Sequence, residues 1–349
     1  MERSSCLENQ CFGAIRSRLM LIAMAILCMH NADAQTGACY GTLGNNLPPP
    51  REMIALCKHH NIQSIRLYNP NPALVEPLQG SNVSVIVGVP NEEIQGIARD
   101  ESLAISWVRD NILKYRNINF RYIAVGNEIS PSANPDISPH VPIAMQHISD
   151  ALAAAGLRRV KVSTALSMEI LGLSNPPSLG SFQSQFLDLF INPIIKFLVK
   201  TNSPFLVNVY PYFAYVSDTT NIRLDYALFT SKSSVVKDGA YQYYNLFDAM
   251  VDAVHVALEK AGGANIRVVV SETGWPSAGG TATTVGNAGT YNSNLLKSVK
   301  KGAPRRPGKP IETYIFDLID ENNKSPELEK HWGIFLANKN PKYPLSFTA

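Results

Sequence analysis

Two glutamates lie at the ends of apolar segments of this sequence. Glu128 closes the segment YIAVGNE, and Glu272 lies in the segment VVVSETGWP. Hydrolysis of a glycosidic bond uses two carboxyl groups in one cleft, one to protonate the leaving oxygen and one to act at the anomeric carbon. A single glutamate of this kind is more simply explained as a loop cap or a partner of a lysine. Two of them in this setting predict catalysis.

The elements that must position these glutamates alternate between strand and helix along the chain. Several of the β-rich segments are continuously apolar, which is typical of strands covered on both faces. The sequence therefore predicts an α/β fold, a single (β/α)8 TIM barrel. The predicted strands are 39–42, 64–68, 83–89, 122–128, 160–165, 205–210, 267–273 and 312–318, and the main predicted helices are 50–60, 103–116, 142–155, 186–201, 243–262 and 291–301.

An open, doubly wound sheet is the alternative arrangement. A dinucleotide-binding sheet would carry GxGxxG after an early strand, and a nucleoside triphosphatase would carry GxxxxGK[ST], but neither motif follows a predicted strand. A barrel also accounts for the two glutamates, because its catalytic groups lie at the C-terminal ends of the strands. The fourth and seventh strands would bring Glu128 and Glu272 together across the barrel mouth.

Composition and charge fit an ordinary globular protein. The 349 residues are 45% hydrophobic and 17% charged, with a formal net charge of +3. The basic residues within 297–301 and 305–309 form short clusters, which a solvated surface explains better than nucleic-acid binding does. We therefore expect no nucleic-acid partner.

The first 34 residues have the order of a secretory signal peptide. Arg3, Arg16 and Arg18 precede an apolar run over 19–29 and the small-residue sequence ADA at 32–34. Cleavage after Ala34 would leave a catalytic domain of residues 35–349. We expect this domain to be secreted to the apoplast or cell wall rather than sent to the vacuole. The last residues, SFTA, form no hydrophobic tail, so we expect no membrane anchor.

Only two cysteines, Cys39 and Cys57, lie outside the predicted signal peptide. Cys39 opens the first predicted strand and Cys57 lies in the first predicted helix. In a secreted protein the two either pair as a disulfide or stay buried as thiols. The sequence leaves both alternatives open.

Further motifs are spread over the chain: CYG at 39–41, GNNLP at 44–48, IRLY at 65–68, GVPN at 88–91, AVGNE at 124–128, NVYPYF at 208–213, VSETGWP at 270–276 and HWG at 331–333. Together they resemble the plant glucan endo-1,3-β-glucosidases of glycoside hydrolase family 17. The resemblance implies that Glu128 is the proton donor and Glu272 the nucleophile. It also implies that Asn127 hydrogen-bonds the sugar 2-hydroxyl. Burial and a second carboxylate would give the acid its raised pKa.

The segment after the eighth predicted strand contains DENNK at 320–324 and ELEK at 327–330. The resemblance implies that Glu321, Lys324 and Glu329 support the catalytic pair by tuning its protonation. Glu329 matches better than Glu327, and an exposed Glu/Lys loop is the alternative. Asp317 departs from the small residue of the family's Phe-Ala-x-Phe pattern. If it points inward it needs a partner, because an unpaired buried charge is costly.

Aromatic residues follow several predicted strands. Flat rings with polar edges suit the faces of sugars, although core packing is the commoner role of any one aromatic residue. The hydroxyls of Tyr68 and Tyr210 are also placed to donate to Glu272. The residues predicted to contact substrate are Tyr68, Tyr210, Phe213 and Trp275.

The resemblance implies a retaining endo-hydrolase of (1→3)-β-D-glucosidic linkages in callose, laminarin or fungal wall glucan, which we expect to act as a monomer. No metal or organic cofactor is expected, since no HExxH, CxxC or comparable spacing occurs. Two alternatives remain: an endo-hydrolase of mixed-linkage β-1,3-1,4-glucan, and a catalytically weak glucan-binding barrel. A chitinase is disfavoured because the sequence has no DxxDxDxE run.

Overall fold

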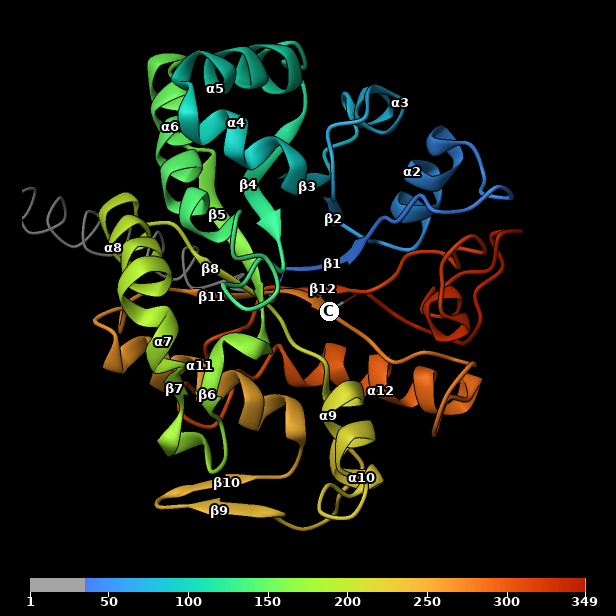
Figure 1. The fold of residues 1–349 in the computed structure, drawn as a ribbon. Coiled ribbons are helices and arrows are strands. Elements are labelled where there is room, and N and C mark those ends of the chain that lie inside the picture. Colours follow the sequence, from blue (N-terminus) through green and yellow to red (C-terminus); the bar gives the residue numbers. More distant parts are fainter. Residues whose placement is uncertain (1–34, 349) are drawn as a thin grey trace, which may run out of the picture. The chain divides into compact units, whose positions relative to one another are not determined.

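The computed structural model describes residues 35–348; the predicted signal peptide at 1–34 and Ala349 lie outside the described residues. Eight parallel strands close into a barrel in the order β1-β12-β11-β8-β5-β4-β3-β2 (Figure 1). The prediction of a (β/α)8 barrel is therefore confirmed. The strands are β1 (Thr36–Cys39), β2 (Ser64–Leu67), β3 (Ser84–Val89), β4 (Asn119–Asn127), β5 (Lys161–Ser167), β8 (Phe205–Asn208), β11 (Val268–Thr273) and β12 (Thr313–Ile315).

Helices connect the strands, and two short hairpins extend the loops. In Figure 1 the helices α4, α5 and α6 lie together beside β3, β4 and β5. Within residues 35–348 no helix is long and apolar enough to cross a membrane. The helices are α2 (Pro50–His59), α3 (Pro72–Val75), α4 (Ile94–Arg99), α5 (Glu101–Val108), α6 (Val141–Ala154), α7 (Ser184–Phe186), α8 (Asn192–Thr201), α9 (Pro211–Ser217), α10 (Leu224–Ala227), α11 (Leu246–Lys260) and α12 (Val285–Ser298), and the hairpins pair β6 (Leu171–Leu173) with β7 (Ser181–Phe182) and β9 (Val236–Asp238) with β10 (Tyr241–Tyr243).

The first strand lies earlier in the chain than predicted. The sequence predicted it over 39–42, whereas β1 ends at Cys39. The backbone N–H of Gly41 donates to the side chain of Asp317 at 3.2 Å, and that of Leu43 donates to Glu321 at 2.6 Å. Since these donors bond to side chains instead of a neighbouring strand, the ladder stops before them.

Both cysteines of the described residues are buried free thiols. Burial raises the pKa of Cys57 to about 12, so its thiol is protonated at neutral pH and unreactive. Of the two alternatives that the sequence left open, the structure has the buried thiols rather than the disulfide.

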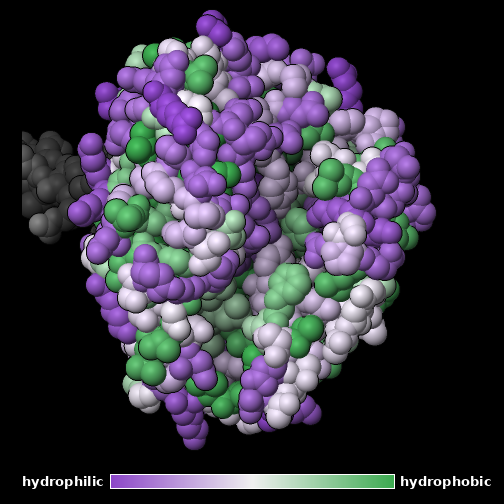
Figure 2. Space-filling model, viewed as in Figure 1, coloured by the Kyte–Doolittle hydropathy of each residue, from purple (hydrophilic) through white to green (hydrophobic). Residues whose placement is uncertain are grey.

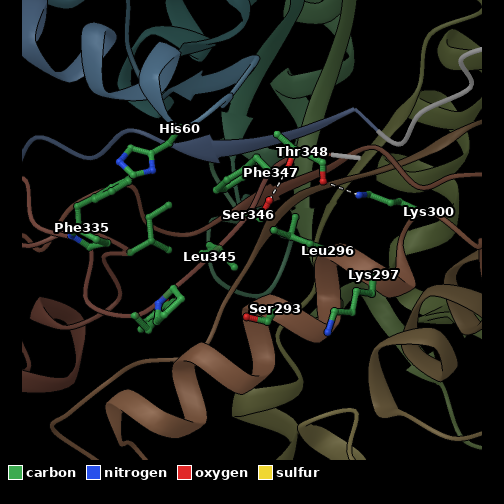
Figure 3. A pocket seen from close by; sticks show the side chains of 14 residues that line it. His60, Ser293, Leu296, Lys297, Lys300, Phe335, Leu345, Ser346, Phe347 and Thr348 are labelled. Carbon is green, nitrogen blue, oxygen red and sulfur yellow. Dashed lines mark hydrogen bonds between the residues drawn. The ribbon is translucent and has the colours of Figure 1, made fainter.

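The C-terminal segment of the described chain packs beside α12. Figure 3 shows Leu345 and Phe347 beside Leu296 of α12 in the lining of a pocket of about 620 Å³. Lys300 Nζ donates to the carbonyl oxygen of Thr348 at 3.1 Å. None of the residues predicted to do chemistry lines this pocket.

Two aspartates are buried on α11. Asp248 accepts a hydrogen bond from Asn245 Nδ2 at 2.6 Å, and Asp252 accepts from the Tyr243 hydroxyl at 3.0 Å and from the Arg305 backbone at 2.9 Å. Burial raises the pKa of both carboxyl groups from 3.8 to about 6. The native protein therefore binds these protons more tightly than the unfolded chain. Their stabilising contribution is complete below about pH 4 and is lost as the pH rises through 6.

Replacing one of these buried carboxylates by an amide should stabilise the protein only where the carboxylate is charged. We predict that Asp248→Asn raises the free energy of unfolding by about 1–3 kcal/mol at pH ~7.5, since no charge then has to be desolvated. At pH ~4 the gain should vanish, because the wild-type carboxyl is already protonated. Denaturant unfolding at the two pH values measures both. Asp150→Asn, on the exposed face of α6, is the matched control. Equal gains at both pH values would contradict the assignment.

Candidate active site

A cleft of about 1180 Å³ opens at the C-terminal ends of the barrel strands. Figure 2 shows this face of the molecule hollowed near its middle, with both hydrophilic and hydrophobic residues around the hollow. The structure brings nine of the ten sequence-predicted site residues into the lining of the cleft: Tyr68, Asn127, Glu128, Tyr210, Phe213, Glu272, Glu321, Lys324 and Glu329. The tenth, Trp275, is discussed below.

Glu272 lies at an irregularity near the end of β11. The pairing register of β11 shifts between Val270 and Glu272 against β8, where Glu272 faces Asn208. Against β12 the register also shifts between Val270 and Thr273. Such bulges re-aim a side chain relative to the regular alternation of a strand. The Glu272 side chain is thereby buried at the floor of the cleft, with the residue 5% exposed.

Three donors hold the Glu272 carboxylate. Arg66 Nη1 donates to Oε1 at 2.8 Å and the Tyr68 hydroxyl donates to the same oxygen at 2.8 Å. The Tyr210 hydroxyl donates to Oε2 at 2.7 Å. The predicted hydrogen bonds from Tyr68 and Tyr210 to Glu272 are therefore confirmed, whereas their contact with substrate stays a prediction. Hydrogen bonds to a charged group are shorter and stronger than neutral ones, so these three donors fix the direction of the carboxylate.

Arg66 is a site residue that the sequence reasoning missed. It is 1% exposed on β2, and its guanidinium also donates to Asn127 Oδ1 at 2.7 Å and to Asn208 Oδ1 at 3.1 Å. A buried arginine requires an anion and further acceptors in a fixed geometry. Its signal was available as a charged residue inside the apolar strand SIRL. Asn208, in the apolar strand FLVN, carries the same signal.

Glu128 follows β4 with its backbone in the left-handed region. Its φ is 55°, and the preceding Gly126 has φ 80°. A side chain at Gly126 would place Cβ 2.8 Å from Ile94 Cδ1, so the close packing of β4 requires glycine there. For a residue with a side chain this conformation costs about 1–2 kcal/mol. The Glu128 backbone N–H donates to the carbonyl of Ala165 at 2.8 Å, which helps to hold the strained turn.

The surroundings of the Glu128 carboxyl raise its pKa. Burial raises the pKa of Glu128, and the nearby charge of Glu272 raises it further. A hydrogen bond from Asn208 Nδ2 at 2.9 Å partly opposes this shift. One carboxylate held by a guanidinium and two hydroxyls, in the same cleft as one carboxyl with a raised pKa, is the arrangement of a nucleophile and a general acid.

Asn127 is fixed so that its amide nitrogen remains available to the cleft. Its Oδ1 accepts from Arg66 Nη2 at 2.7 Å and from Asn208 Nδ2 at 3.2 Å. Because the carbonyl side of the amide faces these donors, the orientation of the group is determined. Its Nδ2 donates to no side chain or backbone group in residues 35–348. This donor can therefore serve a substrate hydroxyl.

Glu321, Lys324 and Glu329 form one charged wall of the cleft. Lys324 Nζ lies 2.7 Å from Glu321 Oε2 and 4.3 Å from the centre of the Phe316 ring. Burial raises the pKa of Glu329, and the charge of Lys324 opposes this shift. Glu327 instead makes exposed ion pairs outside the cleft lining. The structure therefore favours Glu329 over Glu327 as the residue beside the pair.

The prediction that Trp275 contacts substrate is wrong. Its ring is fully buried, its Nε1 donates to the carbonyl of Ala282 at 3.0 Å, and it packs against Tyr212 with ring centres 5.0 Å apart. The indole turns into the core behind the cleft because it finds both apolar neighbours and a hydrogen-bond acceptor there. Trp332 lines the cleft instead, with its ring centre 5.3 Å from that of Tyr210.

The two catalytic candidates should be electrostatically coupled. We predict that Glu272→Gln lowers the pKa of Glu128, because removing the neighbouring negative charge favours ionisation of the remaining carboxyl. NMR titration of carboxyl-labelled glutamate measures this pKa. Glu329→Gln is the matched control and should lower it less, since the charge of Glu329 is a smaller cause of the shift. An unchanged pKa in Glu272→Gln would show that burial alone sets it.

Known proteins are similar to this chain in sequence and in fold. The family described as glycosyl hydrolases family 17 matches residues 36–347. A glucan endo-1,3-beta-glucosidase of Vitis vinifera is 50% identical over 335 residues, which cover 95% of this chain and 97% of that protein. The basic vacuolar isoform GLB of glucan endo-1,3-beta-glucosidase from Nicotiana tabacum is 49% identical over 333 residues, which cover 94% of this chain and 89% of that protein. The structure of CJP38, a beta-1,3-glucanase and allergen of Cryptomeria japonica pollen, superposes with a TM-score of 0.87 at 44% sequence identity. The match covers 90% of this chain and 99% of that chain. The chain belongs to glycosyl hydrolase family 17.

Proposed function

We propose that this glycoside hydrolase cleaves internal (1→3)-β-D-glucosidic linkages of β-1,3-glucans with retention of configuration. One observation carries the proposal: a carboxylate held by three donors, Glu272, lies in one cleft with a carboxyl of raised pKa, Glu128. The names of relatives at 50% and 49% identity support the linkage. The cleft of about 1180 Å³ exceeds the usual size of a small-molecule site, which suits several sugars of a polymer.

The reaction is a double displacement. Glu128 gives its proton to the glycosidic oxygen while Glu272 attacks the anomeric carbon, so the glycosidic bond breaks and a glycosyl ester forms on Glu272. Glu128, now ionised, takes a proton from a water molecule. This water attacks the anomeric carbon from the face opposite to the ester bond with Glu272. The ester bond breaks, and Glu272 leaves as a carboxylate. Two inversions return the β configuration.

The surrounding residues position the catalytic pair and the substrate, and they compensate the negative charge of the cleft. Arg66, Tyr68 and Tyr210 hold the Glu272 carboxylate by hydrogen bonds and fix its direction. Asn127 offers its amide N–H to the sugar 2-hydroxyl, a hydrogen bond that strengthens in the transition state of such reactions. Lys324 limits the repulsion among the carboxylates of the wall.

We also propose that residues 1–34 are a signal peptide and that the mature domain acts outside the cell, in the apoplast or cell wall. The order of positive, apolar and small residues supports a leader. Relatives named as basic vacuolar isoforms make the vacuole the second candidate destination.

Product analysis on laminarin tests the linkage, the endo action and the stereochemistry together. We predict a ladder of oligosaccharides whose new reducing ends first appear in the β configuration, as followed by chromatography and proton NMR. Mixed-linkage β-1,3-1,4-glucan should be cleaved more slowly at equal concentration. Preference for the mixed-linkage polymer would favour the alternative hydrolase, and binding without products would favour a non-catalytic barrel.

Substrates with different leaving groups distinguish an acid role of Glu128 from a structural role. We predict that Glu128→Gln lowers kcat on laminarin by about 10²–10⁴-fold, because the leaving oxygen then receives no proton. Formation of the glycosyl ester from an aryl β-laminaribioside with an acidic phenol should be much less affected, since that leaving group needs no proton. Burst-phase kinetics measure this step. Glu327→Gln, outside the cleft lining, is the control. Equal losses on both substrates would contradict the assignment.

A further inference from the structure

Asp317 is a buried carboxyl group that the proposed reaction does not use. It lies two residues after the end of β12 and is 1% exposed. Its Oδ1 accepts from the backbone N–H of Leu318 at 2.5 Å and of Gly41 at 3.2 Å. Its Oδ2 is buried without a hydrogen-bond partner among the described residues. A buried oxygen of this kind is costly unless a proton or a donor satisfies it.

The unpartnered oxygen of Asp317 faces a second buried carboxyl group, that of Glu321. Both border Gly41: a Cβ atom on that residue would lie 2.4 Å from Asp317 Oδ2 and 2.3 Å from Glu321 Oε2. Only a glycine fits between the two groups and the backbone of the loop after β1. The two oxygens therefore share one small, water-excluded volume.

The charges around Asp317 do not balance if every carboxyl is ionised. Lys324 is the cation that contacts Glu321, with Nζ 2.7 Å from Oε2. Lys342 is engaged by Asp320 at 2.6 Å. Two carboxylates that face each other in a buried site with one cation cannot both ionise readily, so one keeps its proton. The other titratable groups near Asp317 or the Glu321–Lys324 pair are Cys39, Tyr40 and Glu329.

We propose that Asp317 is protonated in the native protein and donates this proton through Oδ2 to Glu321, as a positioning residue for the Glu321–Lys324 ion pair. Burial and the charge of Glu321 raise the pKa of Asp317 well above its usual range, in agreement with this geometry. Glu321 then accepts hydrogen bonds from Asp317 and from the Leu43 backbone N–H, the latter at 2.6 Å, and its Oε2 forms the ion pair with Lys324 at 2.7 Å.

The consequence reaches the cleft through Lys324. Its ammonium lies over the Phe316 ring, and Phe316 lines the cleft with its ring centre 6.2 Å from that of Tyr210. Tyr210 in turn holds Glu272. A fixed Glu321–Lys324 pair therefore keeps one wall of the cleft in place. An ionised Asp317 would add a negative charge to that wall and draw Lys324 away from it.

Infrared spectroscopy reads the protonation state without any reference to activity. In protein with carboxyl-labelled aspartate, the wild type at pH ~8 should show the C=O stretching band of a protonated carboxyl, and Asp317→Asn should lack it. At this pH Asp248 and Asp252, with pKa values of about 6, contribute carboxylate bands only. A wild-type spectrum with no protonated aspartate band overturns the proposal. This arm needs only the wild type, so it stands even if a variant fails to fold.

The positioning role rests on the proposed glucan hydrolysis and is read from pH profiles of kcat/KM on laminarin. Asp317→Asn keeps a donor to Glu321, so it should stay within about threefold of wild type with an unmoved alkaline limb. Asp317→Ala loses that hydrogen bond and should lower kcat/KM about three- to tenfold. An alkaline limb shifted to lower pH in Asp317→Asn would mean that a negative charge was removed, and would overturn the proposal, as would full activity of Asp317→Ala. Absence of laminarin hydrolysis in the wild type would instead count against the proposed function and leave the infrared result intact.

Discussion

The buried ion pair between Arg66 and Glu272 is the interaction on which the rest of the site depends. Neither group is compatible with the apolar interior of a barrel without the other, and removing one partner of such a pair typically costs about 3–5 kcal/mol. The planar guanidinium does more than neutralise the carboxylate. It also binds the side-chain oxygens of Asn127 and Asn208, so one side chain on β2 connects groups on β4, β8 and β11. The positions of the amide groups follow from that of Arg66.

This constraint also separates the two carboxyl groups chemically. Arg66 lies against Glu272, whereas Glu128 receives its hydrogen bond from a neutral amide, Asn208. Burial and the charge of Glu272 then act on Glu128 in the same direction and raise its pKa. The raised pKa of Glu128 thus follows from its burial and its neighbours. The same principle operates at Asp317 and Glu321, where Lys324 contacts only one of two buried carboxyl groups.

The sequence was sufficient to predict the barrel from simple periodic features, and it named nine of the residues that line the cleft, some from strand ends and some from the family resemblance. Continuous apolar runs predict buried parallel strands, and polar residues at their ends predict the mouth of the barrel. The sequence was insufficient where hydrogen bonds of side chains interrupt the regular pattern of a strand or its end. Strand β1 ends early because Asp317 and Glu321 accept its following N–H groups, and Trp275 turns into the core where Ala282 accepts its N–H. The bulges that aim Glu272 depend on neighbouring strands far away in the sequence.

In the proposed reaction Glu272 is the nucleophile, and its glycosyl ester is an intermediate. Trapping with a 2-deoxy-2-fluoro-β-laminaribiosyl fluoride tests this assignment. The fluorine at C2 slows both formation and hydrolysis of the glycosyl ester, because both transition states resemble an oxocarbenium ion. The activated fluoride leaving group speeds only the formation, so the ester accumulates. Mass spectrometry of the digested protein should find one added disaccharide, on the peptide that contains Glu272. A label on Glu128 or on another residue, or turnover to the α anomer without any label, would contradict the account.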